Sequence, residues 1–224
     1  DTLGNLIATK RGGGTKIQFA AHMDEIGIIV TTIDEKGFLR FGNIGGISPQ
    51  RLIAQRVQFK DGTIGVIGAE KVDDPKDLTL EKLYIDIGAA SEAEAKTKVG
   101  VGEIAAFDRD FADLGQRVVA KALDNRAGCA VLIEALKRVA KPQNDLYCTF
   151  TVQEEVGLRG ARTSAFGIEP DLGIALDVTG TGDVIDPGAN AVIGQVEGKG
   201  NASLKLSKYF FEKLEQEGIP THYV

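Results

Sequence analysis

Short apolar runs separated by turn residues dominate the beginning of the chain. Residues 3–9, 16–21 and 26–33 are rich in isoleucine, valine, phenylalanine and threonine, and glycine-rich or polar segments lie between them. Runs of this composition and length predict β-strands. We therefore expect the chain to start with strands joined by tight turns.

A second group of short strands follows at close spacing. The runs are residues 38–41, 52–59, 63–69 and 83–87. Asp61-Gly62 is a strong hairpin signal between two of them. One helical stretch, residues 91–99, interrupts this section. The pattern predicts that residues 35–117 form a small β-rich unit, either a barrel or a sandwich.

From residue 118 onward, apolar strands alternate with amphipathic helices. Residues 125–140 place apolar side chains on one helical face, and Asp124 is expected to be the N-cap of this helix. The expected face comprises Ala127, Ala130, Val131, Leu132, Ala135, Leu136 and Val139. The elements expected after it are a strand over 146–152, a helix over 157–166, a strand over 172–178 and a helix over 203–217 that ends at Gly218.

This alternation is typical of an α/β fold, in which helices cover both faces of a mixed sheet. The β-rich section interrupts it. We therefore expect one discontinuous domain, made of residues 1–34 and 118–224, with residues 35–117 inserted as a second domain.

Composition and charge narrow the functional classes. Lys and Arg total 26 against 32 Asp and Glu, and no basic run could neutralise a nucleic-acid backbone. No apolar run approaches the roughly 18 residues of a membrane-spanning helix. Cys129 and Cys148 lie among apolar residues, which favours buried free thiols. These features predict a cytoplasmic protein without nucleic-acid or membrane partners.

The only methionine is Met23, and residues 221–224 resemble the start of a strand, so we expect both ends to lie within a larger fold.

Four polar clusters with acidic residues are expected where apolar strands end. They are His22-Met23-Asp24-Glu25, Leu123-Asp124-Asn125, Gln153-Glu154-Glu155 and Leu176-Asp177-Val178. A half-buried carboxylate costs several kcal/mol unless it is paired or coordinates a metal. Because the ligand crevice of an open α/β sheet lies at the carboxyl ends of its strands, the sequence predicts a cation site there.

The spacing within two of these clusters indicates roles. His22 and Asp24 are two residues apart in an extended segment, so both side chains face the same side, and Asp24 can orient a metal-bound imidazole. Glu154 and Glu155 follow a strand and are expected to point to opposite sides, one as metal ligand and the other as general base. A surface turn with a chance histidine and an acidic helix N-terminus are the open alternatives.

Taken together, four motifs resemble the metal-site motifs of the M42 family of metalloaminopeptidases. The motifs are Ala21-His22-Met23-Asp24-Glu25-Ile26-Gly27, Ala122-Leu123-Asp124-Asn125-Arg126-Ala127-Gly128, Val152-Gln153-Glu154-Glu155-Val156-Gly157-Leu158-Arg159-Gly160-Ala161 and Ala175-Leu176-Asp177-Val178-Thr179. The resemblance implies an aminopeptidase with two divalent metal ions, usually zinc or cobalt, that releases N-terminal residues from short peptides. It also implies that the inserted domain mediates dimerisation, with a dodecamer as a larger assembly.

The resemblance also assigns ligands. His22 and Asp177 resemble the terminal ligands of one metal, Asp124 the carboxylate that bridges both, and Glu155 a ligand of the second. In the family a further histidine near the C-terminus binds the second metal, and nothing in this sequence matches that segment. His222 resembles an ordinary strand residue instead, so we expect the second metal position to be incomplete.

Two further residues are assigned by the same resemblance. Glu154 resembles the general base, and Asp24 resembles the carboxylate that steadies His22. Two other functions stay open: a glycoside hydrolase of the endoglucanase type, which also uses paired carboxylates, and a non-catalytic assembly subunit. The absence of tryptophan and the 6% aromatic content argue against a sugar-binding cleft.

Overall fold

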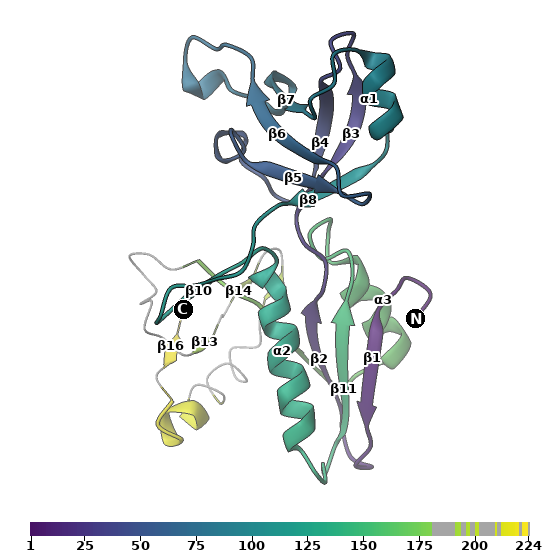
Figure 1. The fold of residues 1–224 in the computed structure, drawn as a ribbon. Coiled ribbons are helices and arrows are strands. Elements are labelled where there is room, and N and C mark those ends of the chain that lie inside the picture. Colours follow the sequence, from purple (N-terminus) through teal and green to yellow (C-terminus); the bar gives the residue numbers. More distant parts are fainter. Residues whose placement is uncertain are drawn as a thin grey trace. The chain divides into compact units, whose positions relative to one another are not determined.

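The computed structural model describes residues 1–180, 191–193, 196–197, 200–201, 209, 212–219 and 221–223. The chain divides into two compact units, Asp1–Val178 and Thr179–Val224. The first unit contains a four-stranded sheet and a closed barrel (Figure 1). Among the described residues, no helix combines the length and the apolar character needed to cross a membrane.

The sheet is mixed, as expected, and its strands come from distant parts of the sequence. Its order is β1 (Leu6–Lys10), β11 (Asp145–Thr151), β2 (Lys16–His22) and β12 (Leu172–Ala175). β11 is antiparallel to β1, whereas β2 is parallel to both β11 and β12. The carboxyl ends of three parallel strands therefore share one edge, and acidic segments of the sequence leave the sheet there.

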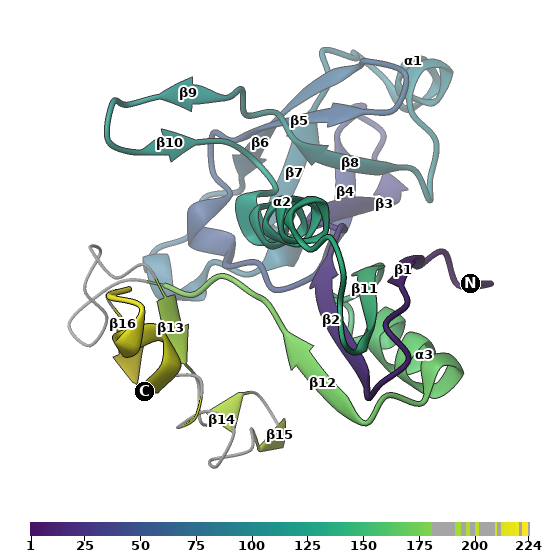
Figure 2. The same cartoon turned by 90° about the horizontal axis from the view of Figure 1, so that it is seen from below.

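Two helices cover opposite faces of this sheet (Figures 1 and 2). They are α2 (Leu123–Arg138) and α3 (Arg159–Ile168). Ala21 of β2 belongs to the same buried apolar cluster as Cys129 of α2. Gln18, which alternation turns to the other face, donates a hydrogen bond to Ser164 Oγ of α3 at 3.0 Å. Cys129 and Cys148 are buried free thiols, as predicted.

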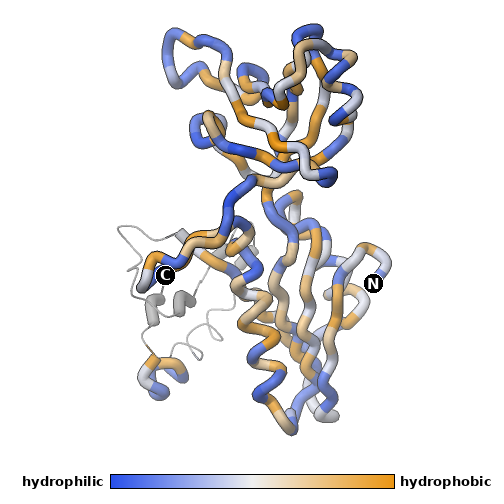
Figure 3. The backbone as a smooth tube through the Cα atoms, viewed as in Figure 1, coloured by the Kyte–Doolittle hydropathy of each residue, from blue (hydrophilic) through white to orange (hydrophobic). Residues whose placement is uncertain are grey.

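The β-rich section forms a closed six-stranded barrel rather than a sandwich. Around the barrel the strands are β3 (Gly27–Ile33), β4 (Leu39–Ile44), β7 (Leu83–Asp86), β6 (Ile64–Ala69), β5 (Arg56–Phe59) and β8 (Ile104–Phe107). Apolar residues concentrate in these strands and polar residues in the connecting loops (Figure 3). Ile28, Leu39 and Ile85 are completely buried inside. Each such side chain contributes roughly 1.5–3 kcal/mol of transfer free energy.

The barrel differs from the expected inserted unit in its first and last strands. β3 belongs to the barrel, although residues 1–34 were expected to lie in the other domain. β8 was not predicted, yet it closes the barrel by pairing with both β3 and β5. Gly27 lies opposite Ala106 in the register of β3 and β8, so the chain enters and leaves the barrel on adjacent strands.

Several local elements complete the first unit. The helix α1 (Glu92–Lys98) is capped by the Ser91 side chain, which accepts a hydrogen bond from Glu94 N. The strand expected over 52–59 begins only at residue 56, because a 3-10 helix precedes it and Ala54 has a φ of +64°. The short elements are the 3-10 helices Pro49–Arg51, Pro75–Asp77 and Leu80–Lys82 and the hairpin of β9 (Ala112–Asp113) and β10 (Val118–Val119).

The start of α2 corrects the prediction that Asp124 is its N-cap. Asp124 and Asn125 both have non-helical dihedral angles. The cap-like bond is made by Asn125, whose Oδ1 accepts from Gly128 N three residues later at 3.2 Å. Asp124 is therefore free of the capping role, and its side chain is 59% exposed.

The apolar face expected for α2 is also partly wrong. The buried positions are Asn125, Cys129 and Leu132, whereas Val131 is 56% exposed and Ala130 and Ala135 are exposed as well. The helix rests on the sheet along a narrow stripe of positions three or four residues apart. Apolar residues beside that stripe therefore stay at the surface.

The turn between β1 and β2 is tied to the start of β11 by one carboxylate. Gly12 N and Gly13 N each donate to Asp145 Oδ1 at 2.9 Å, and Arg11 Nη1 lies 2.7 Å from Asp145 Oδ2. The hydrogen bonds from Gly13, Arg11 and Gly12 lower the pKa of Asp145 to about 2.

Because this pKa is depressed on folding, Asp145 stabilises the fold at pH values above its ordinary pKa of 3.8, and the contribution disappears as the pH falls toward 2. We expect Asp145→Asn to be less stable than the parent chain at pH 5, with a difference that shrinks below pH 4. Denaturant unfolding of both proteins at several pH values measures this. A difference that is independent of pH would contradict it.

The second unit, Thr179–Val224, is described in part. Its strands are β13 (Ala191–Ile193), β14 (Val196–Glu197), β15 (Gly200–Asn201) and β16 (Thr221–Tyr223). Of the helix expected over 203–217, residue 209 and residues 212–216 are helical, and the others before 217 lie outside the described residues. Gly218 has a φ of +70° and ends this helix, as predicted.

Candidate metal centre

His22 lies at the centre of a cluster of acidic side chains at the carboxyl edge of the sheet. It is the last residue of β2 and is only 2% exposed. Its Nε2 lies 3.1 Å from Asp124 Oδ1. The same atom lies 3.8 Å from Glu154 Oε2 and 3.8 Å from Asp177 Oδ1. Three segments that are far apart in the sequence thus converge on the imidazole of a fourth.

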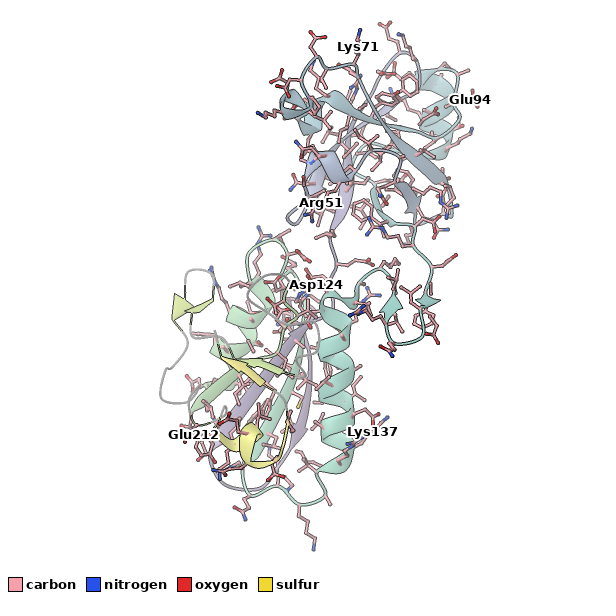
Figure 4. All side chains as sticks on the ribbon, turned by 90° about the vertical axis from the view of Figure 1, so that its left-hand side faces the viewer. Arg51, Lys71, Glu94, Asp124, Lys137 and Glu212 are labelled. Carbon is pink, nitrogen blue, oxygen red and sulfur yellow. The ribbon has the colours of Figure 1, made fainter. Side chains whose placement is uncertain are left out.

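Each partner reaches the cluster from the end of a different element. Asp124 stands at the beginning of α2, where Figure 4 labels it. Asp177 follows β12, and its Oδ1 also accepts a hydrogen bond from Val178 N at 2.8 Å. Parallel pairing of β12 with β2 brings the residues after β12 to the level of His22. The strand ends therefore decide which side chains meet.

Glu154 and Glu155 were expected to point to opposite sides of a strand, but they do not lie in one. β11 ends at Thr151, and Gln153 has a φ of +57°, so the alternation stops before the two glutamates. Both carboxylates lie in the cluster. Ligand atoms of His22, Asp124 and Glu155 all lie within 4.8 Å of one another. The two glutamates share one site because they stand in a turn.

Asp24 contacts the cluster differently from the predicted carboxylate–imidazole bond. His22 Nδ1 lies 3.1 Å from the main-chain oxygen of Asp24 but 3.6 Å from its Oδ1. The Asp24 carboxylate accepts hydrogen bonds from Glu154 N at 3.1 Å and from Glu155 N at 3.2 Å. Asp24 therefore holds the histidine with its backbone and the glutamate turn with its side chain.

The electrostatics of the cluster favour a positive ion. Burial raises the pKa of Glu154, of Glu155 and of Asp177 above the usual values, and neighbouring carboxylates, including Asp124, raise them further. His22 acts in the opposite direction on each of them. Half-buried carboxyl groups that lie this close together thus disfavour one another's ionised forms. A cation bound between them would remove the free-energy cost of ionising them.

The donor set fits a divalent transition metal. Carboxylate oxygens and an imidazole nitrogen are the usual ligands of zinc and its neighbours in the first transition series. His22, Asp124 and Glu155 are the one group of metal-competent side chains found within 4.8 Å among the described residues. The structure therefore brings together His22, Asp124, Glu155, Glu154 and Asp177, with Asp24 beside them.

Three charged residues lie beside the cluster, and no role was predicted for them from the sequence. Glu25 Oε1 lies 2.6 Å from Lys121 Nζ and 3.4 Å from Arg126 Nη2. A cavity of about 380 Å³ adjoins this ion pair and the cluster. Its lining includes Glu25, Ile26, Phe107, Lys121, Asp124 and Glu155. Glu25 stands next to Asp24, but nothing in the neighbouring sequence indicates that it pairs with Lys121 and Arg126, about one hundred residues further along the chain.

Asn125 was included in a polar cluster and in a motif of the sequence, but no role was predicted for it. It is 1% exposed, and both ends of its amide are bonded within the unit. Asn125 is a polar residue between the candidate ligand Asp124 and the apolar positions of the helix, and this place in the sequence is the signal that could have identified it. His222 lies in β16, opposite Val192 of β13, and its side chain lies outside the described residues.

Comparison with known proteins gives several relatives. A protein of Acetivibrio thermocellus is 58% identical over 184 residues, which are 82% of this chain and 56% of that protein. The lysyl aminopeptidase of Pyrococcus furiosus is 37% identical in an alignment of 218 residues that covers 85% of this chain and 63% of that protein. The chain thus spans about three fifths of the length of these relatives.

Several solved structures are also similar to this chain. An aminopeptidase from the archaeon Desulfurococcus kamchatkensis superposes with a TM-score of 0.88 at 38% identity, covering 100% of this chain and 68% of that one. The TET1 peptidase of Pyrococcus horikoshii, described as assembling into a tetrahedron or a large octahedral shell, gives 0.85 at 34% identity, with 100% and 72% covered. A structure from Thermotoga maritima titled as an endoglucanase gives 0.82 at 32% identity, with 100% and 71% covered.

The sequence matches the family described as M42 glutamyl aminopeptidase over residues 4–224. This match extends across both units and includes all four acidic segments of the cluster. The chain belongs to the M42 peptidase family.

Proposed function

We propose that this chain carries the catalytic site of a metal-dependent aminopeptidase that releases N-terminal residues from short peptides. The observation that supports this most strongly is the buried His22 surrounded by carboxylates from three other segments of the chain. Membership of the M42 family and the lysyl aminopeptidase among its relatives point in the same direction.

The proposed site holds two divalent ions, zinc or cobalt. His22 and Asp177 would bind one ion, Asp124 would bridge both, and Glu155 would bind the second. When bound, such ions polarise a peptide carbonyl and favour deprotonation of water. The ligand set within this chain is larger for the first ion than for the second, so the first is expected to bind more tightly.

Glu154 is the proposed general base. Its carboxylate is half-buried beside His22, and burial together with Asp177 and Asp24 raises its pKa, which makes it a stronger proton acceptor. It would accept the proton of the attacking water and pass it to the amine that leaves. Asp24 is a positioning group, since its carboxylate accepts hydrogen bonds from the backbone N–H groups of Glu154 and Glu155.

The decisive experiment measures release of a chromophore from aminoacyl p-nitroanilides by the chain loaded with Zn²⁺ or Co²⁺. A chelator should abolish the reaction. An N-acetylated version of the same substrate is the matched control and should not be cleaved, because an aminopeptidase needs a free amine. Equal cleavage of both substrates would contradict aminopeptidase activity.

A glycoside hydrolase is the second candidate, because one structural relative is titled as an endoglucanase. Glycosidases use two carboxyl groups on either side of a sugar, commonly with aromatic side chains nearby. The cluster instead centres on a buried imidazole, which suits a metal ligand better. Activity on carboxymethyl cellulose, measured beside the peptide assay, decides between the two. A non-catalytic assembly subunit would be indicated by the absence of bound metal.

We also propose that the barrel mediates self-association, in a dimer and in a larger assembly of dodecamer type. Structural relatives are described as a dodecamer and as tetrahedral or octahedral shells. The proposed interface lies on the inserted barrel, which is remote in sequence from most of the cluster.

The register of the barrel strands shows where the barrel can be deleted from the chain. Because Gly27 and Ala106 are paired on adjacent strands, a short glycine linker can join them without moving β2 or α2. We expect the shortened chain to be monomeric by light scattering, whereas the full chain self-associates. An unchanged oligomer after the deletion would show that the interface lies elsewhere.

A further inference from the structure

The side-chain amide of Asn125 links two segments that carry candidate ligands. Its Nδ2 donates to the main-chain oxygen of Leu176 at 2.7 Å, and its Oδ1 accepts from Gly128 N at 3.2 Å. Asn125 follows Asp124 directly, and Leu176 precedes Asp177 directly. One amide thus connects the beginning of α2 to the end of β12.

The link continues to the strand that carries His22. Leu176 N donates to Ala20 O of β2 at 2.8 Å. The main chain of Leu176 therefore bonds to β2 on one side and to Asn125 on the other. Through it, the segments that carry His22, Asp177 and Asp124 are held in one hydrogen-bonded chain.

The surroundings leave little freedom for this amide. Asn125 is 1% exposed. A Cβ atom added to Gly128 would lie 2.3 Å from Asn125 Oδ1 and 3.3 Å from Ala21 Cβ. The glycine thus allows the helix to approach the amide closely. Because the two neighbours are a carbonyl and an N–H group, the site needs a side chain with one donor and one acceptor, and asparagine supplies both.

We propose that Asn125 is a positioning residue that fixes the separation of Asp124 and Asp177 and thereby sets the affinity of the site for its metal. This inference rests on the metal site proposed above. Hydrogen-bonded residues behind metal ligands typically contribute about 10–100-fold to metal affinity, because they orient the ligands before the ion binds. Asn125 would act in this way on two ligand segments at once.

The test is titration of the full chain with Co²⁺, followed by visible absorption and calorimetry. We expect Asn125→Ala to bind Co²⁺ about 10–100-fold more weakly and to show a changed absorption spectrum. Gln18→Ala is the matched control. Gln18 is a buried amide of the same unit that bonds to Thr149 Oγ1 and Ser164 Oγ, on the face of the sheet covered by α3.

Both substitutions remove a buried amide, so both are expected to lower the stability of the metal-free chain, but only Asn125→Ala should change Co²⁺ binding. If Asn125→Ala does not fold, Gly128→Ala tests the same idea, because it displaces the amide without removing it. Unchanged Co²⁺ affinity and spectrum in a folded Asn125 or Gly128 variant would overturn the inference. Failure of the unsubstituted chain to bind Co²⁺ would instead overturn the proposed metal site.

Discussion

Glu154→Gln is expected to keep the bound metal and to lose most of the turnover. Glutamine has nearly the same shape as glutamate, but its amide cannot accept the proton that a general base must take. General base catalysis contributes about 10²–10⁴-fold, so kcat for an aminoacyl p-nitroanilide should fall by that factor. The metal content of the same preparation, measured by atomic emission, should stay the same because Glu154 is not among the proposed ligands.

The control is Glu134→Gln, an equally conservative change at an exposed position of α2. It should leave both kcat and metal content unchanged. If Glu154→Gln retained a nearly normal kcat with its metal in place, another residue would have to be the base.

Asp124→Asn is expected to lose metal as well as activity. The Asp124 carboxylate lies 3.1 Å from His22 Nε2, and it belongs to the one three-residue ligand group found in the described part of the chain. Replacing it with an amide removes the negative charge that two cations would share. The loss of metal affinity should therefore exceed the roughly 10–100-fold effect of residues behind the ligands.

Metal content after dialysis, and activity restored by added Zn²⁺ or Co²⁺, measure this effect. Asp110→Asn, at an exposed position between the barrel and α2, is the matched control and should bind metal normally. Full metal content in Asp124→Asn, with the fold intact, would contradict the bridging role of Asp124.

The convergence of the cluster could be predicted from the sequence because it depends on strand ends. His22 ends β2 and Asp177 follows β12. Apolar runs reveal strands, and parallel strands of an α/β sheet share their carboxyl edge. Residues placed directly after such runs therefore meet whatever the exact register is, and the motifs of the family pointed to the same positions.

The precise contacts of this cluster could not be predicted in the same way. The sequence placed Asp24 against the imidazole, but its carboxylate accepts from Glu154 N and Glu155 N. Those N–H groups are available because the chain turns at Gln153, where φ is +57°. A single positive φ angle does not produce a periodic pattern in the sequence, so it could not be predicted from one.

The barrel, too, could be predicted from the sequence only in part. Most of its strands were predicted from short apolar runs at close spacing, but β8 was missed and β3 was assigned to the other domain. Closure needs β8 to pair with β3 and β5, partners that are far from it in the sequence. Whether a β-rich segment closes into a barrel depends on such long-range pairing.

By itself, the sequence determined the class of fold, the strand ends that carry the acidic residues, and the family. Local patterns suffice for these because strand periodicity and short motifs are properties of neighbouring residues. Only the tertiary structure decided that Asn125 rather than Asp124 caps α2, and that its amide reaches Leu176, 51 residues away. The free energy of a buried polar group depends on the partners that surround it in space, and these come from segments whose distance in sequence carries no signal.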